Sequence, residues 1–176
     1  MFTRSEILAA LAGSQEKLFV YYQALTPEEL EQVCTSSEVP DDTPWRVKDH
    51  LAHLALVEHA FQRMIRQTLQ GEIDPVGFSR VGATNRQEIL HWINQRNQAY
   101  FEAHYDDSLE TILSEFVATR AESLALLARL TDEELALPVP GAPWSDGSIG
   151  GVLITNAAHA TQHLGWVEAG LGQLKV

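Results

Sequence analysis

Apolar residues recur every three to four positions along five long stretches of the chain, and this period predicts amphipathic helices. We expect these helices at about residues 5–25, 45–69, 85–104, 108–130 and 148–171. Two shorter helices are expected at about 27–32 and just after Thr131, because each follows a threonine with early acidic residues. No stretch alternates apolar and polar residues over the length of a strand, so we expect an all-α protein.

Polar residues that can cap a helix stand at the start of the first four long stretches. The predicted caps are Thr3 or Ser5, then Thr43, Thr84 and Ser108. Their side-chain oxygens can accept hydrogen bonds from backbone amides that have no partner inside the helix. Pro44 suits the first helical position, where a missing backbone amide costs nothing, so we expect the second long helix to begin at about Trp45.

The segments 39–44, 72–82 and 137–147 are rich in proline, glycine or acidic residues and are expected to be loops. Four long helices with shorter connecting elements bury their apolar stripes most simply as an antiparallel four-helix bundle. The longer loops permit a crossover, so strict up-down-up-down order does not follow. Composition does not shift along the chain, and we expect residues 1–176 to form one domain.

Composition and charge narrow the classes of partner. The chain has 176 residues, of which 45% are hydrophobic and 20% charged, with a formal net charge of −12. This acidic balance argues against nucleic acid and against anionic membrane surfaces, because both favour a basic patch. The N-terminus does not resemble a secretory signal, and no apolar run reaches the roughly 18 residues of a membrane span. A cytoplasmic protein is therefore expected.

His159 and His163 lie four residues apart in the last predicted helix, so their side chains lie one turn apart on the same face. Apolar residues share that face: Ile149, Val152, Leu153, Ala160, Val167 and Leu171. Two neutral imidazoles one turn apart can bind a single transition-metal ion. The alternative is that each is a hydrogen-bonded core histidine, and a pair alone does not decide between these interpretations.

His53, in the second long helix, is the best candidate for a third ligand, since sites in helical bundles are built from inward side chains on facing helices. Three histidines would leave one coordination position open, as in catalytic metal sites. We expect a divalent transition metal, with zinc or nickel favoured, although imidazole also suits iron and copper. A metalloprotease is excluded, because Ala160 stands where that motif requires glutamate.

Three further polar residues fall on inward faces and are candidates for the pocket or for contacts to the ligands. Glu58 and Arg120 could pair as a structural bridge, or Arg120 could bind a substrate carboxylate. Asn156 could orient a ligand imidazole, or it could simply bind backbone. His50, His91 and His104 are instead expected to be surface or core residues without a role in the site. Arg96 falls on the inward face of the 85–104 helix.

The sequence from Trp45 to Leu54 resembles the second-helix motif of the DinB-like superfamily, in which a tryptophan precedes a histidine by eight residues. The pair His159 and His163 is similar to the second motif of that superfamily. The middle of the chain most resembles the ClbS/DfsB-type branch, through Asn97, Gln98, Ala99, Tyr100, Leu109, Phe116 and Arg120.

The resemblance implies a four-helix bundle in up-down-down-up order, with a metal ion held by His53, His159 and His163. Relatives in the superfamily include bacillithiol- and mycothiol-dependent transferases, a mycothiol-dependent maleylpyruvate isomerase and genotoxin-resistance proteins. A low-molecular-weight thiol is therefore an implied cosubstrate. This range of activities means that the fold does not determine the reaction.

Three hypotheses follow. The chain is a metal-dependent enzyme that acts on a small electrophilic molecule as a transferase, hydrolase or isomerase. Alternatively, it binds and sequesters a small toxic molecule without turnover, or its histidines serve only stability. In the first two cases the partner is a small molecule. The sequence is compatible with a homodimer but does not decide the oligomeric state.

Overall fold

A computed structural model describes residues 2–35, 45–82 and 85–174 of the chain. Five long helices lie within these ranges: α1 Arg4–Gln23, α3 Val47–Leu69, α4 Arg86–Ala103, α5 Leu109–Arg129 and α7 Ile149–Leu174. Three short helices connect them: α2 Pro27–Leu30, the 3₁₀ helix η1 Phe78–Val81, and α6 Asp132–Leu135. Two short strands complete the described elements: β1 Val33–Thr35 and β2 Trp45–Arg46.

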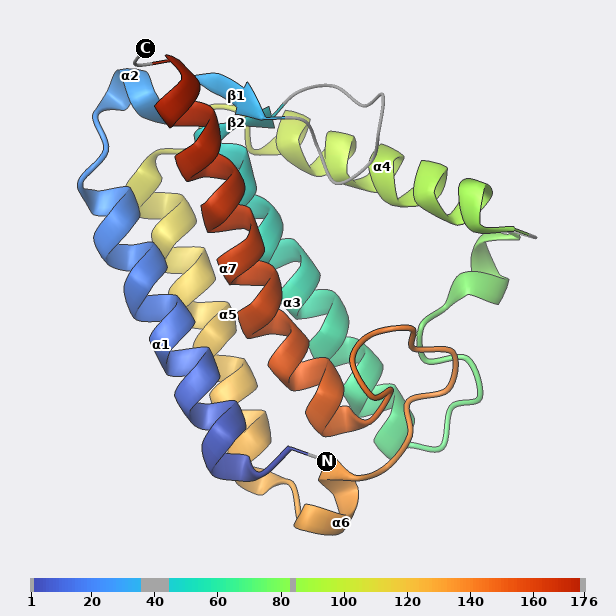
Figure 1. The fold of residues 1–176 in the computed structure, drawn as a ribbon. Coiled ribbons are helices and arrows are strands. Elements are labelled where there is room, and N and C mark those ends of the chain that lie inside the picture. Colours follow the sequence, from blue (N-terminus) through green and yellow to red (C-terminus); the bar gives the residue numbers. More distant parts are fainter. Residues whose placement is uncertain (1, 36–44, 83–84, 175–176) are drawn as a thin grey trace.

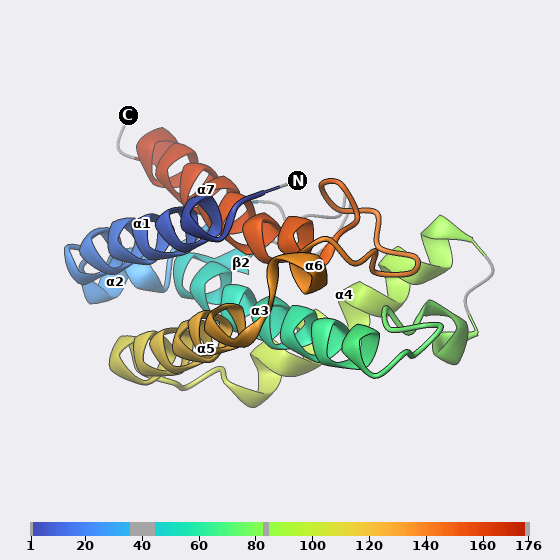
Figure 2. The ribbon, with the colours of Figure 1, turned by 90° about the horizontal axis from the view of Figure 1, so that it is seen from below.

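The helices α1, α3, α5 and α7 form a four-helix bundle (Figure 1). Seen along the bundle, α1 lies beside α7 and α3 lies beside α5 (Figure 2). Helix α3 also packs on α7, and α5 packs on α1. The chain runs along α1, back along α3 and α5, and forward again along α7. The predicted all-α bundle in up-down-down-up order is therefore confirmed.

The fifth long helix, α4, is the crossover connection. Because α3 and α5 run in the same direction, the chain between them must return along the whole bundle. Helix α4 makes most of that return and lies outside the four-helix bundle, against the α3 side (Figures 1 and 2). This arrangement leaves room between α4 and the bundle for the cavity described below.

The starts of α1 and α5 and of the short helices α2 and α6 follow the predicted capping chemistry, whereas the starts of α3 and α4 differ from it. Thr3 caps α1, where its side chain accepts from the amide of Glu6, and Ser108 caps α5. Asn85 caps α4, whereas the expected cap was the preceding threonine, which lies outside the described residues. The second long helix, expected from about Trp45, begins two residues later: α3 starts at Val47, and Trp45 and Arg46 form β2. The proposed cap and proline of that helix, residues 43 and 44, also lie outside the described residues.

The expectation that the chain has no strands needs correction. β1 and β2 pair antiparallel, with Val33 opposite Arg46. Strands of two or three residues are too short to show a period-two pattern, so no alternation of apolar and polar residues indicates them. The amide of Val47 donates to the carbonyl of Gln32, and the Tyr22 hydroxyl donates to the Val47 carbonyl. These bonds tie the start of α3 to α1 and hold Trp45 against the bundle.

The core is divided into two apolar clusters by a layer of polar side chains. One cluster joins the starts of α1 and α7 to the ends of α3 and α5, around Leu11, Ile65 and Leu153. The other fills the opposite end around Tyr22, Leu51 and Phe116. Between them lie fully or nearly fully buried polar residues from three helices: Ser14, Glu58, Gln62, Thr119, Arg120 and Ser123. No described helix is long and apolar enough to cross a membrane.

Candidate metal centre

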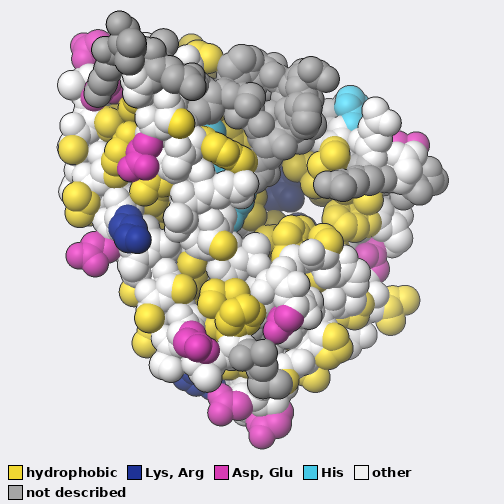
Figure 3. Space-filling view, viewed as in Figure 1, with side chains coloured by type: hydrophobic (Ala, Val, Ile, Leu, Met, Phe, Trp, Pro, Cys, Tyr) yellow, Lys and Arg dark blue, Asp and Glu magenta, His cyan; other side chains and the backbone are white. Residues whose placement is uncertain are grey.

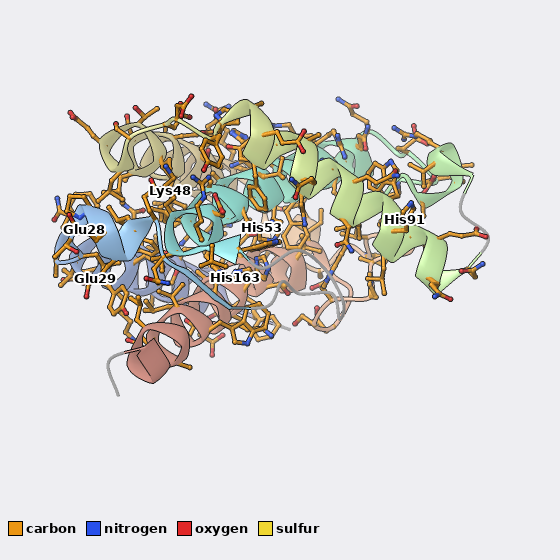
Figure 4. The ribbon with its side chains drawn as sticks, turned by 90° about the horizontal axis from the view of Figure 1, so that it is seen from above. Glu28, Glu29, Lys48, His53, His91 and His163 are labelled. Atoms are coloured by element: carbon orange, nitrogen blue, oxygen red, sulfur yellow. The ribbon has the colours of Figure 1, made fainter. Side chains whose placement is uncertain are left out.

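The three histidines predicted as ligands come together on the face that α3 and α7 share. One ligand nitrogen each from His53, His159 and His163 lie within 4.8 Å of one another. His53 and His163 are fully buried, and His159 is partly exposed. Figure 4 shows His53 on α3 beside His163 on α7, while His91 lies far away on α4. Among the described residues, these three form the one such group of potential ligands.

The positions of these nitrogens fit a transition-metal ion. The Nε2 atoms of His159 and His163 are 2.9 Å apart. Two nitrogens at that separation can both lie about 2.0–2.1 Å from one ion, the distance at which imidazole binds zinc. Glu58 is not a member of the group, and no described carboxylate or thiol adds a fourth ligand atom. The donor set is therefore three imidazoles, which suits zinc, nickel, copper or iron.

His50 supports the cluster, a role that the sequence analysis did not assign to it. It is fully buried, and its Nδ1 lies 2.9 Å from Nδ1 of His163. If His163 binds an ion through Nε2, its Nδ1 carries the proton and donates to His50, which fixes the tautomer of the ligand. His50 precedes His53 by one turn on α3, so its inward position was available from the helical period.

Trp45 forms the wall behind the histidines. Its ring centroid is 4.8 Å from that of His53, and it stacks on His163 at 5.9 Å with an interplanar angle of 18°. Phe101 of α4 packs edge-on against Trp45, with the ring centroids 4.8 Å apart. All four side chains are buried. The tryptophan of the motif therefore restricts how the imidazoles can rotate and keeps water from their inner side.

A cavity of about 420 Å³ opens beside the histidines, between α3, α4, α7 and two loops. Figure 3 shows the hollow on this face, with Lys or Arg atoms visible inside it. His53 and His159 form part of its wall, and most of the remaining wall is apolar or aromatic: Leu56, Val57, Ala60, Phe61, Met64, Val76, Phe78, Leu90, Trp92, Ile93, Trp144 and Ala158. Its volume falls in the range of about 300–1,000 Å³ that is typical of small-molecule sites.

The charged side chains that line this cavity are cationic. They are Arg63 of α3 and Arg96 of α4, and no aspartate or glutamate is among the lining residues that the structure describes. The Arg96 guanidinium lies 5.8 Å from the Trp92 ring. Burial, together with the neighbouring charge of Arg63, lowers the pKa of Arg96 below its ordinary value. The polar lining residues are Asn97, Thr155 and Gln162.

The three residues proposed as pocket or supporting candidates lie elsewhere. Arg120 pairs with Glu58, its Nε lying 2.8 and 3.0 Å from the two carboxylate oxygens, and neither residue lines the cavity. Asn156 is buried, and its amide nitrogen has no hydrogen-bond partner among the described residues. The structure thus places Glu58 and Arg120 in the structural bridge, and the contact to a candidate ligand comes from His50 and not from Asn156.

A match to a protein-family model shows which family the chain belongs to. The family model of the DinB superfamily matches residues 37–167. The chain belongs to the DinB superfamily. A comparison with curated proteins found no match, so the superfamily assignment carries no activity with it.

Two solved structures share the fold of this DinB superfamily chain. An uncharacterised protein from Escherichia coli UTI89 is 20% identical with a TM-score of 0.73, over 99% of this chain and 95% of that one. The colibactin self-resistance protein ClbS, in complex with a double-stranded DNA, is 17% identical with a TM-score of 0.70. That similarity covers 94% of this chain and 93% of ClbS. At these identities, the likeness shows a common fold.

The expectation that nucleic acid is excluded as a partner is wrong. ClbS has the same fold and is bound to double-stranded DNA. The net charge of a chain does not exclude such a partner, because it averages over the whole surface, whereas a partner meets a local field. Here a net charge of −12 coexists with two arginines in one cavity.

Proposed function

We propose that this chain is a metal-dependent enzyme that acts on a small electrophilic molecule, with the ion held by His53, His159 and His163. The observation that carries the proposal is the position of His53 and His159, which belong both to the group of three nitrogens and to the cavity wall. A substrate in that cavity would lie against the ligands themselves. Three ligands leave a coordination position for water, a thiol or a substrate atom, as in catalytic zinc sites.

The divalent ion would supply Lewis acidity, polarising a substrate group or lowering the pKa of a bound water or thiol. The protein's own part is orientation and the exclusion of water. With His163 bound to the ion through Nε2, His50 would accept a hydrogen bond from Nδ1 of His163, and Trp45 limits the rotation of the rings. The apolar walls of the cavity, which include Phe61 and Trp144, would exclude water from a bound substrate.

The residues also favour a nucleophile that arrives from outside the protein. Among the described residues that line the cavity, none is a serine, cysteine, aspartate or glutamate that could attack a substrate, and the hydroxyl of Thr155 donates to the carbonyl of Gly151 within its own helix. A water molecule or a low-molecular-weight thiol would therefore have to attack. This is why we propose transferase, hydrolase or isomerase chemistry rather than a covalent enzyme intermediate.

The decisive measurement is the metal content of the His159→Ala variant. Both proteins should be purified without a histidine tag, saturated with zinc or nickel, desalted and analysed for bound metal. We expect about one equivalent in the wild type and well below one in the variant, with unchanged helical circular dichroism. His91→Ala, on the exposed face of α4, is the matched control and should retain the full equivalent. Full metal binding by His159→Ala would refute the ligand assignment.

The alternative is that the same cavity sequesters a small molecule without turnover. What supports it is that His53 and His159, the proposed metal ligands, are the only general-base candidates among the described residues that line the cavity. A panel of small electrophiles, assayed with and without a low-molecular-weight thiol, separates the two functions. Turnover that disappears in His159→Ala supports the enzyme. Stoichiometric protection from the electrophile without product would instead support sequestration.

A further inference from the structure

The cavity holds two arginines whose charges no described residue compensates. Neither Arg63 nor Arg96 forms an ion pair or hydrogen bond with the described residues. Other arginines of the chain behave differently: Arg46 pairs with Glu31 and Asp49, and Arg66 pairs with Glu122. Arg96 is half-buried, whereas Arg63 is exposed. A half-buried arginine that lacks a carboxylate partner is unfavourable unless a ligand supplies the negative charge.

The two arginines come from different helices and face the same space. Arg63 projects from α3 and Arg96 from α4, and the two charges interact with each other. Helix α4 is the crossover, so the bundle alone would not bring two like charges together here. Two guanidinium groups that converge on one cavity form a fork that matches a carboxylate, sulfonate or phosphate.

We propose that Arg63 and Arg96 form an anion-binding subsite, and that the ligand of the cavity is a small molecule with one anionic group and an apolar, ring-sized body. The arginines bind the anionic group, and the walls at Phe61, Trp92 and Trp144 pack against the body. The far end of such a ligand would then reach His53 and His159 in the same cavity. As a substrate class this rests on the proposed function, but the binding itself requires neither metal nor turnover.

Two fluorescent probes that differ in charge test this subsite. Anilinonaphthalene sulfonate carries the aromatic body and an anionic group, and phenylnaphthylamine is its neutral counterpart. We expect the Arg63→Gln/Arg96→Gln double variant to bind the sulfonate at least about tenfold more weakly than the wild type, since charge-assisted bidentate contacts are lost. Its affinity for the neutral probe should change less than about twofold, because the apolar walls are intact.

Arg66→Gln is the matched control for charge. Arg66 lies three residues after Arg63 on the same helix, is exposed, and does not line the cavity. Its substitution should leave both probe affinities unchanged. Ala60→Phe is the control for location: Ala60 lines the cavity, so a larger side chain there should weaken both probes together. Circular dichroism verifies that each variant is folded.

Several outcomes would overturn the subsite. One is an equal loss of both probes in the arginine double variant, which would mean that the cavity had collapsed. Another is the same loss of the sulfonate in Arg66→Gln, which would indicate general surface charge. A third is intact sulfonate preference with loss of duplex DNA binding, which would assign the arginines to a nucleic-acid backbone.

The proposed function and the subsite can fail separately. Probe binding is measured on protein stripped of metal with a chelator, and then repeated with zinc restored. Sulfonate selectivity without any metal binding would refute the metal-dependent enzyme and keep the subsite. Stoichiometric metal binding without sulfonate selectivity would refute the subsite and leave the proposed metal-dependent enzyme unaffected.

Discussion

At the scale of single residues, Arg120 shows how a charged group, whose burial costs free energy, is accommodated in a core. Its side chain is fully buried and contacts two helices besides its own. It donates to Glu58 on α3, and to the carbonyl of Leu11 and the hydroxyl of Ser14 on α1. These bonds satisfy the guanidinium and tie three helices at one level of the bundle. A core arginine is therefore structural here, not a substrate clamp.

A double-mutant cycle should reveal this pairing. We expect Arg120→Met or Glu58→Gln alone to lower the free energy of unfolding by about 3–5 kcal/mol, since each leaves a buried partner without its bonds. The double variant should lose clearly less than the sum of the two. Urea unfolding followed by circular dichroism measures all four proteins.

The ion pair between Arg66 and Glu122 is a matched control, because it joins the same two helices. Its nitrogen and oxygen atoms are 3.3 Å apart, and both side chains are about half exposed. Its coupling energy should be below about 1 kcal/mol, because solvent screens the charges. If the coupling energy of Arg120 and Glu58 were equally small, the buried bridge would contribute no more to stability than the exposed pair.

His50 should tune the metal affinity without binding the metal itself. His50→Phe keeps a ring in the space between Trp45 and His163 but removes the nitrogen that faces His163. We expect about 10–100-fold weaker zinc binding in competition with a chelator, a loss that is typical when the hydrogen-bond partner of a metal ligand is removed. His91→Phe should not change the affinity. An unchanged affinity in His50→Phe would show that His163 is held by packing alone.

At the scale of elements, the start of α7 depends on the close approach of the Asp146 side chain to the backbone of Gly151. The amide of Gly151 donates to the Ser148 hydroxyl, and Ser148 in turn donates from both its amide and its hydroxyl to Asp146. These bonds hold the pKa of Asp146 below its ordinary value. A Cβ atom at residue 151 would overlap the Asp146 carboxylate. The glycine is therefore needed for this cap, and the cap orients the helix that carries His159 and His163.

Two glycine-to-alanine substitutions in α7 should have opposite effects. A Cβ atom at residue 165 would have no neighbouring atom within 4 Å. Gly165→Ala should therefore raise the free energy of unfolding by about 0.4–1 kcal/mol through helix propensity. Gly151→Ala has the same intrinsic advantage but displaces Asp146, so we expect a lower melting temperature than that of the wild type. Calorimetry measures both. Stabilisation by Gly151→Ala would mean that the Asp146 cap is dispensable.

At the scale of the whole molecule, the candidate metal site is not part of what holds the bundle together. Two apolar clusters and the Arg120 layer connect all four bundle helices. The three histidines connect α3 and α7, which also pack together through buried apolar residues. Removing an ion from such a site leaves the burial of the core unchanged.

Chelation should therefore lower stability modestly. For an ion present at about a hundred to a thousand times its dissociation constant, linkage predicts a loss of about 3–4 kcal/mol. We expect a small fall in melting temperature with retained helical circular dichroism, while any turnover disappears. Unfolding on chelation would mean that the site is structural, and the enzyme proposal should then be abandoned.

The sequence by itself determined what depends on neighbours within one or two helical turns. The period of apolar residues predicted the five long helices, and side-chain oxygens at Thr3 and Ser108 predicted two of their caps. The spacing of His159 and His163 placed both imidazoles on one face, because a helix repeats its direction every 3.6 residues. The motif from Trp45 to His53 added the resemblance to the superfamily.

Only the tertiary structure decided what depends on helices far apart in the sequence. It brought His53 of α3 to the pair on α7, assigned Arg120 to Glu58, and placed His50 behind His163. It also brought Arg63 and Arg96 into one cavity, which needs the position of the crossover helix α4. The physical reason is that helical periodicity determines which way a side chain faces, but only the packing of helices determines which side chain it meets.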